Sequence, residues 1–160
     1  MKRESKALKA LLYGTGKTLA TAESCTGGGI AAAIVATSGS SDYFKGGIVS
    51  YCNEVKERLL GFNPNTIEKC DVVSAEVARE MWLVVMKARS TDYAISITGC
   101  AGPNGGTEHI PVGTIWIGYG SKNDVRTYLL TKDEGREKNL KNATQKALQL
   151  MIAFLEETLE

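Results

Sequence analysis

Residues 18–28 read TLATAESCTGG, and they place the end of a strand directly before the start of a helix. Strand and helix patterns alternate on both sides of this stretch, and a pair of strands then ends the alternation. Helices are predicted at 5–13, 27–38, 53–61, 74–90 and 136–155, and strands at 18–24, 46–52, 92–99, 111–120 and 125–131. This order predicts a three-layer α/β/α sandwich with a mixed, mostly parallel sheet plus a C-terminal antiparallel hairpin.

The bulk composition predicts one domain over residues 1–160 and excludes several classes of function. Lys plus Arg number 19 and Asp plus Glu 18, so the net charge of +1 offers no electrostatic case for binding nucleic acid or a membrane. No apolar run approaches the ~20 residues that a membrane helix requires, and no signal peptide is evident. The four cysteines lack metal-binding spacing, so we expect no metal, no cofactor and a cytoplasmic location with reduced thiols.

The junction between strand and helix carries the first candidate site. A helix N-terminus offers unpaired amide donors and a partial positive charge, so Thr26, Gly27 and Gly28 are candidates for binding an oxyanion or a phosphate. Ser24, beside those amides, is the candidate nucleophile. The plain alternative is that Ser24 and Thr26 only cap the helix, and that Cys25 is a small buried residue rather than a nucleophile.

Two later segments add candidates. Tyr51 lies at the end of the strand predicted at 46–52, and Lys56 lies one turn into the next predicted helix. Each could also be an ordinary packing or solvated residue. The glycine-rich loop that follows the strand at 92–99 can turn its backbone amides toward a ligand, although its spacing matches no phosphate-loop motif. The candidate substrate-binding residues of this segment are Thr98, Gly99, Ala101 and Gly102.

Taken together, these segments resemble the C-terminal domain family of the competence/damage-inducible protein CinA. The likeness extends from about residue 19 to residue 118, and more loosely to the end of the chain. It is carried by AESCTGG (22–28), SGSSDYFKGGIVSYCNEVKERLLG (38–61), VSAEVAREM (73–81), ISITGCAGPNGGT (95–107) and PVGTIWIG (111–118). Stand-alone members of this family resemble nicotinamide-nucleotide amidases (PncC type), which hydrolyse the carboxamide of nicotinamide mononucleotide.

The resemblance implies roles for particular residues and a class of partner. It implies that Ser24 is the nucleophile, that Tyr51 and Lys56 activate it, and that Thr98 lies in the substrate pocket. A hydroxyl activated without histidine suits a chain whose single histidine lies in a loop. The implied partner is a small nucleotide substrate, and the implied assembly is a homo-oligomer.

The start of the last helix departs from the family pattern, which has two arginines four positions apart. Arg136 keeps the first arginine of that pattern, whereas Leu140 occupies the position of the second, and Lys141 is the candidate substitute. An arginine there is a natural bidentate partner for phosphate. Two functions therefore remain open: an amidase, and a nucleotide-binding relative without catalytic activity.

Overall fold

The computed structural model describes residues 1–52, 54–55, 58 and 73–159, and shows a five-stranded sheet with the order β2-β1-β3-β4-β5. The strands are β1 (Leu19–Glu23), β2 (Phe44–Val49), β3 (Tyr93–Gly99), β4 (Ile115–Ser121) and β5 (Asp124–Leu130). β1 pairs in parallel with both β2 and β3, while β4 is antiparallel to its neighbours β3 and β5. Only β4 thus opposes the common strand direction, which confirms the predicted mixed sheet and its final hairpin.

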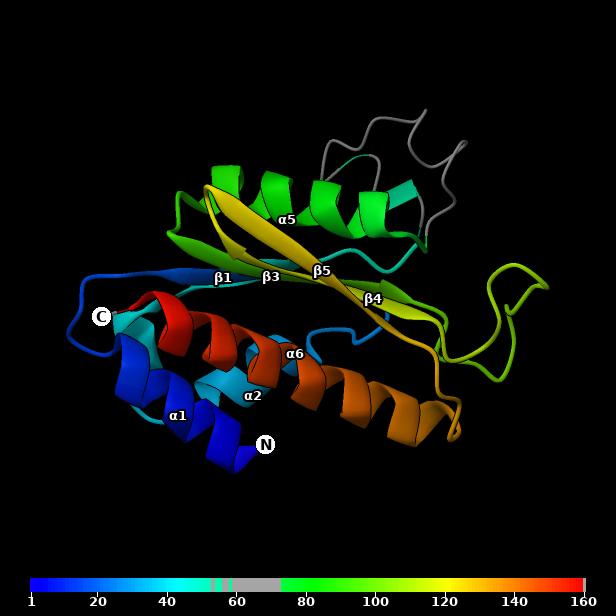
Figure 1. The fold of residues 1–160 in the computed structure, drawn as a ribbon, viewed down its shortest axis with the longest axis horizontal. Coiled ribbons are helices and arrows are strands. Elements are labelled where there is room, and N and C mark those ends of the chain that lie inside the picture. Colours follow the sequence, from blue (N-terminus) through cyan, green and yellow to red (C-terminus); the bar gives the residue numbers. More distant parts are fainter. Residues whose placement is uncertain (53, 56–57, 59–72, 160) are drawn as a thin grey trace.

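Helices cover both faces of the sheet, which confirms the three layers (Figure 1). The described helices are α1 (Lys2–Leu12), α2 (Gly29–Val35), α5 (Ala75–Arg89) and α6 (Arg136–Thr158), with a short 3-10 turn η1 (Ser40–Asp42). α5 lies on one face, and α1, α2 and α6 lie on the other. The connections β1–α2–β2 and β2–α5–β3 run in opposite directions across the sheet, so the right-handed crossover rule places their helices on opposite faces.

The two faces of the sheet are packed differently. On the α6 side, Ile95 and Ile97 of β3 join a large aliphatic and aromatic core. On the α5 side the strands present small residues, such as Ala20 and Ala94, to Trp82 and its neighbours. A Cβ atom at Gly118 would collide with the hydroxyl oxygen of Ser96, which itself donates to the carbonyl of Ala78, so that close packing requires glycine there. Alternate residues of one strand thus serve two cores, as the period of a strand dictates.

Local signals explain where several elements begin and end. Ser74 caps α5 by accepting a hydrogen bond from the backbone N–H of Val77, at the position the sequence predicts. β2 ends at Val49, so Tyr51 lies two residues beyond the strand rather than within it. The helix predicted at 53–61, which contains Lys56, falls largely outside the described residues.

Candidate active site

The carboxyl ends of the parallel strands β1, β2 and β3 meet at one edge of the sheet. The Ser24 amide donates to the Ile97 carbonyl (3.1 Å) and the Ser50 amide donates to the Glu23 carbonyl (2.9 Å), so both ladders continue just past β1. Ser24 is 4% exposed at this edge. The chain reverses its direction across the sheet around β1, and open α/β sheets bind their ligands at such a switch point.

A cavity of about 270 Å³ opens at this edge. It is enclosed by the β1–α2 junction, the loop that follows β3, and the first residue of α6, which lie together on the right of Figure 1. The described residues that line it are Ser24, Cys25, Tyr51, Val73, Gly99, Cys100, Ala101, Gly102, Asn104, Gly105 and Arg136. Six of the residues that the sequence nominated are thus gathered from four separate segments: Ser24, Tyr51, Gly99, Ala101, Gly102 and Arg136.

The other nominated residues are placed differently. Thr26, Gly27 and Gly28 lie just after Ser24, beside the lining rather than in it. Thr98 is fully buried, one residue before the lining begins at Gly99. Lys141 is exposed on α6 and does not line the cavity. Lys56 lies outside the described residues.

Glu23, which sequence reasoning left without a role, organises the start of α2. Its buried carboxylate accepts hydrogen bonds from the Thr26 hydroxyl (2.7 Å) and from the backbone N–H groups of Ile30 (2.7 Å) and Ala31 (3.0 Å). A carboxylate at a helix N-terminus satisfies amides that have no partner within the helix and interacts favourably with the helix dipole. The backbone amides of Ile30 and Ala31 are therefore already hydrogen-bonded within the protein.

The remaining donors of this turn lie closer to Ser24. The Gly27 amide donates to the Ser24 carbonyl and the Gly29 amide to the Thr26 carbonyl, each at 3.0 Å. Among the described residues, the amides of Thr26 and Gly28 have no acceptor. Gly28 has φ of 101°, a left-handed conformation that glycine adopts without steric cost. Two backbone donors next to the serine thus remain available to a ligand.

Arg136, the first residue of α6, joins two walls of the cavity. One guanidinium nitrogen donates to the carbonyl oxygen of Gly102 (2.7 Å), and another donates to the hydroxyl oxygen of Tyr51 (3.0 Å). Tyr51 is 61% exposed, so this contact is what holds its hydroxyl group at the cavity. Guanidinium has five N–H donors, so donors remain for an anionic ligand. Within the described lining, Arg136 is the single charged residue.

Asn139 fixes the position of α6 against the glycine-rich loop. Its side-chain amide donates to the carbonyl of Ala101 (3.1 Å) and to the carboxylate of Asp133 (2.9 Å), and its oxygen accepts from the backbone N–H of Glu134 (2.8 Å). Asn139 is 3% exposed. Nothing in the local sequence marks it, because an asparagine within a helix is usually solvated. The structure alone shows that Asn139 joins the glycine-rich loop to the segment that precedes α6.

The neighbouring electrostatics follow from these contacts. The Asn139 amide, followed by the Gly135 backbone N–H, lowers the pKa of the Asp133 carboxyl below its usual range. Leu140 packs against the hydrophobic core and brings no charge to the cavity.

The described residues contain no group of three or more His, Cys, Asp or Glu placed to hold a metal. No described helix is long and apolar enough to cross a membrane.

The fold and this cavity define an α/β domain with a serine-lined cavity at the carboxyl edge of its sheet. The chain belongs to the CinA C-terminal domain family, whose model matches residues 2–155. Relatives named CinA-like protein include one from Synechocystis sp., 48% identical over 76% of this chain, and one from Thermosipho melanesiensis, 50% identical over 73%. This chain spans 29% of the length of each.

Solved structures agree with the family assignment over nearly the whole chain. A competence/damage inducible protein CihA from Agrobacterium tumefaciens has a TM-score of 0.92 at 30% identity, covering 96% of this chain and 94% of that one. A CinA superfamily protein from Escherichia coli has a TM-score of 0.90 at 31% identity, covering 95% and 89%. The resemblance expected from the sequence motifs and the fold it implied are therefore confirmed.

Proposed function

We propose that this chain is an amidohydrolase that converts the carboxamide of nicotinamide mononucleotide to the carboxylate, with Ser24 as the nucleophile. The observation that carries the proposal is the position of Ser24: it lines a cavity together with Tyr51, Arg136 and the glycine-rich loop. Membership of the CinA C-terminal domain family supports the same assignment. The substrate is inferred from the resemblance of stand-alone family members to nicotinamide-nucleotide amidases.

The reaction divides into two acyl transfers. The Ser24 oxygen attacks the carboxamide carbon while its proton passes to a base, for which Tyr51 and Lys56 are the candidates. The carbon–nitrogen bond then breaks as the amide nitrogen receives that proton, and ammonia leaves. Water attacks the resulting ester, the carbon–oxygen bond to Ser24 breaks, and nicotinate mononucleotide is released. The pyridinium charge of the substrate withdraws electrons and assists both attacks.

In this scheme Tyr51 is suited to the second proton transfer, the return of the proton to the amide nitrogen. Arg136 donates to its hydroxyl oxygen, which leaves the phenolic hydrogen free to point toward another acceptor. The amides of Thr26 and Gly28 are the candidate donors to the oxyanion that develops on the carboxamide oxygen. Removing one such donor typically costs about 10²–10³ in kcat.

The substrate phosphate is assigned to Arg136. Its two contacts, to Gly102 and to Tyr51, hold the guanidinium at the mouth of the cavity before any ligand arrives. A planar guanidinium binds phosphate through two parallel hydrogen bonds, whereas a lysine offers a point charge on a flexible chain. The same side chain would then hold the phosphate and the position of Tyr51.

The test is release of ammonia and nicotinate mononucleotide from nicotinamide mononucleotide by the purified protein. We expect Ser24→Ala to lower kcat by about 10³-fold or more, as removal of a nucleophile does in other hydrolases. Ser40→Ala, a buried serine in η1 away from the cavity, is the matched control and should keep full activity. Equal turnover by Ser24→Ala and the wild type would refute the assigned nucleophile.

Leu140 motivates one alternative, a nucleotide-binding domain that does not turn over its ligand. Its side chain is packed on the core, so α6 contributes one cation to the described lining rather than two. Calorimetry separates the two functions. Binding of nicotinamide mononucleotide without nicotinate product would favour the binding domain, and absence of binding would count against both.

A further inference from the structure

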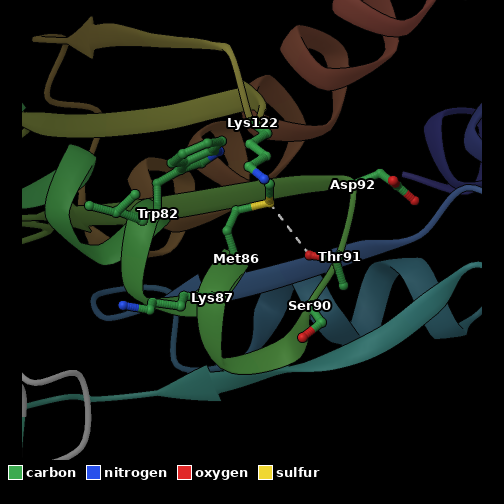
Figure 2. A pocket seen from close by; sticks show the side chains of 8 residues that line it. Trp82, Met86, Lys87, Ser90, Thr91, Asp92 and Lys122 are labelled. Carbon is green, nitrogen blue, oxygen red and sulfur yellow. Dashed lines mark hydrogen bonds between the residues drawn. The ribbon is translucent and has the colours of Figure 1, made fainter.

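A second, larger cavity of about 600 Å³ lies at the opposite edge of the sheet from Ser24 (Figure 2). It is formed by the last turns of α5, the link from α5 to β3, and the turn between β4 and β5. Its lining residues are Trp82, Leu83, Met86, Lys87, Ser90, Thr91, Asp92 and Lys122. The seven residues of β3, at about 3.3 Å each, separate this cavity from the Ser24 edge by about 20 Å. A ligand bound here would therefore not touch the candidate active site.

The inner wall is apolar, and its polar groups have partners within the protein. Trp82 is 2% exposed, and its indole N–H donates to the carbonyl of Ala94 (3.0 Å). The Thr91 hydroxyl donates to the Tyr93 carbonyl (2.9 Å) and lies 3.5 Å from the sulfur of Met86. The polar groups of this wall are thus satisfied within the protein. The apolar surface that a ligand would meet comes mainly from Leu83, which is 59% exposed.

The backbone at the rim is unusual. Ser90 has φ of 50° and ψ of 46°, and it is the only described non-glycine residue with positive φ. Helices commonly end in this conformation with glycine, which adopts it without steric cost. Such conformations at other residues cluster at binding sites. Serine here places a hydroxyl group in the cavity lining that glycine would lack.

The charges at the rim favour an anion. Lys122 extends from the β4–β5 turn toward Met86 and Thr91, and Lys87 lies on the last turns of α5 (Figure 2). Within the described chain, neither lysine has an ion-pair partner. The one acidic residue of the lining, Asp92, already accepts hydrogen bonds from the backbone N–H (2.9 Å) and hydroxyl (3.1 Å) of Thr18.

We propose that this cavity is a binding site for a small organic anion with an apolar body of one or two rings. The body would lie against Leu83 and the exposed edges of Trp82 and Met86. Its carboxylate would meet Lys122, and Lys87 would add positive charge at the rim. The volume falls within the range of about 300–1,000 Å³ that is usual for small-molecule sites. Because the site is remote from Ser24, the proposal stands independently of the amidase function.

Two tryptophans make the test specific. Trp82 lines the cavity, whereas Trp116 pairs with Thr98 near the Ser24 edge of the sheet, so their indole N–H resonances report on opposite edges. The intact chain is titrated with benzoate, 1-naphthoate and, as uncharged and cationic counterparts, benzyl alcohol and benzylamine. We expect the two carboxylates to shift the Trp82 resonance saturably, naphthoate more tightly, while benzylamine leaves it unchanged.

Charge removal at the rim completes the experiment. We expect the double variant K87A/K122A to weaken naphthoate binding by about fivefold or more, because exposed ion pairs contribute modestly each. The double variant K2A/K6A removes the same charge from the exposed surface of α1 and should bind as the wild type does. Shifts confined to Trp116, no shift of Trp82, or unchanged affinity in K87A/K122A would each overturn the proposal.

Discussion

Replacement of Asn139 by leucine tests how the cavity is held together. The substitution keeps the volume of the side chain but removes three hydrogen bonds, to Ala101, Asp133 and Glu134. Asp133 and Glu134 are exposed, so the Asp133 carboxylate and the Glu134 backbone N–H can form hydrogen bonds to water instead. Ala101, by contrast, is buried. Asn139→Leu therefore leaves the carbonyl of Ala101 without a hydrogen-bond donor, and water does not replace it.

The expected cost follows from those contacts. Each lost hydrogen bond contributes about 1 kcal/mol net, and a buried carbonyl left without a donor costs about 1–3 kcal/mol. Because leucine gains some apolar burial in exchange, we expect the free energy of unfolding to fall by about 2–4 kcal/mol in all. That is a large part of the about 5–15 kcal/mol typical of a domain. Urea unfolding followed by circular dichroism measures it.

Asn142→Leu is the matched control. Asn142 lies on the same helix, is exposed, and makes one side-chain hydrogen bond, to the carboxylate of Glu134 (2.6 Å). Its replacement should change the free energy of unfolding by about 0.5 kcal/mol or less. If the two variants unfold at the same urea concentration, with the same slope, the anchoring role assigned to Asn139 is wrong.

The same variant has an activity and a pH dependence that structure alone predicts. Since Asn139 holds the loop beside Arg136, we expect KM for nicotinamide mononucleotide to rise about tenfold and kcat to fall less. The lowered pKa of Asp133 stabilises the fold above the usual aspartate range, and this contribution disappears as pH falls through the folded-state pKa. Asn139→Leu removes its main cause, so the stability gap between the wild type and the variant should narrow in acid.

Three further predictions concern other contacts. Glu23→Gln turns an N–H group toward a backbone donor of α2 and should lower the free energy of unfolding by about 2–3 kcal/mol in urea titrations. Arg136→Lys should raise KM about tenfold for nicotinamide mononucleotide but not for the phosphate-free riboside, while loss of the contact to Tyr51 lowers kcat for both. Hydrogen bonds from Arg126 lower the pKa of both Asp124 and Glu157, so wild-type stability should fall as pH drops below the usual carboxyl range. Arg126→Leu should flatten that acid dependence in thermal unfolding.

The sequence by itself determined the elements and the position of the nucleophile candidate. Regular patterns of apolar residues, with caps such as Ser74, mark helices and strands because these depend on neighbours within a few residues. The rule that parallel strands place ligands at their carboxyl ends then located Ser24 and the loop after β3 at one edge. The family motifs extended this to Tyr51 and Arg136 as members of one site.

Only the tertiary structure decided how that site is held. Arg136 reaches Tyr51 across 85 positions of the chain, and Asn139 reaches Ala101 across 38. Glu23, an ordinary residue of a strand by sequence, accepts the backbone N–H groups of Ile30 and Ala31 at the N-terminus of α2. Such contacts have no periodic signature, because a hydrogen bond between distant segments depends on the orientation of whole elements. That orientation arises when the two cores form on either side of the sheet.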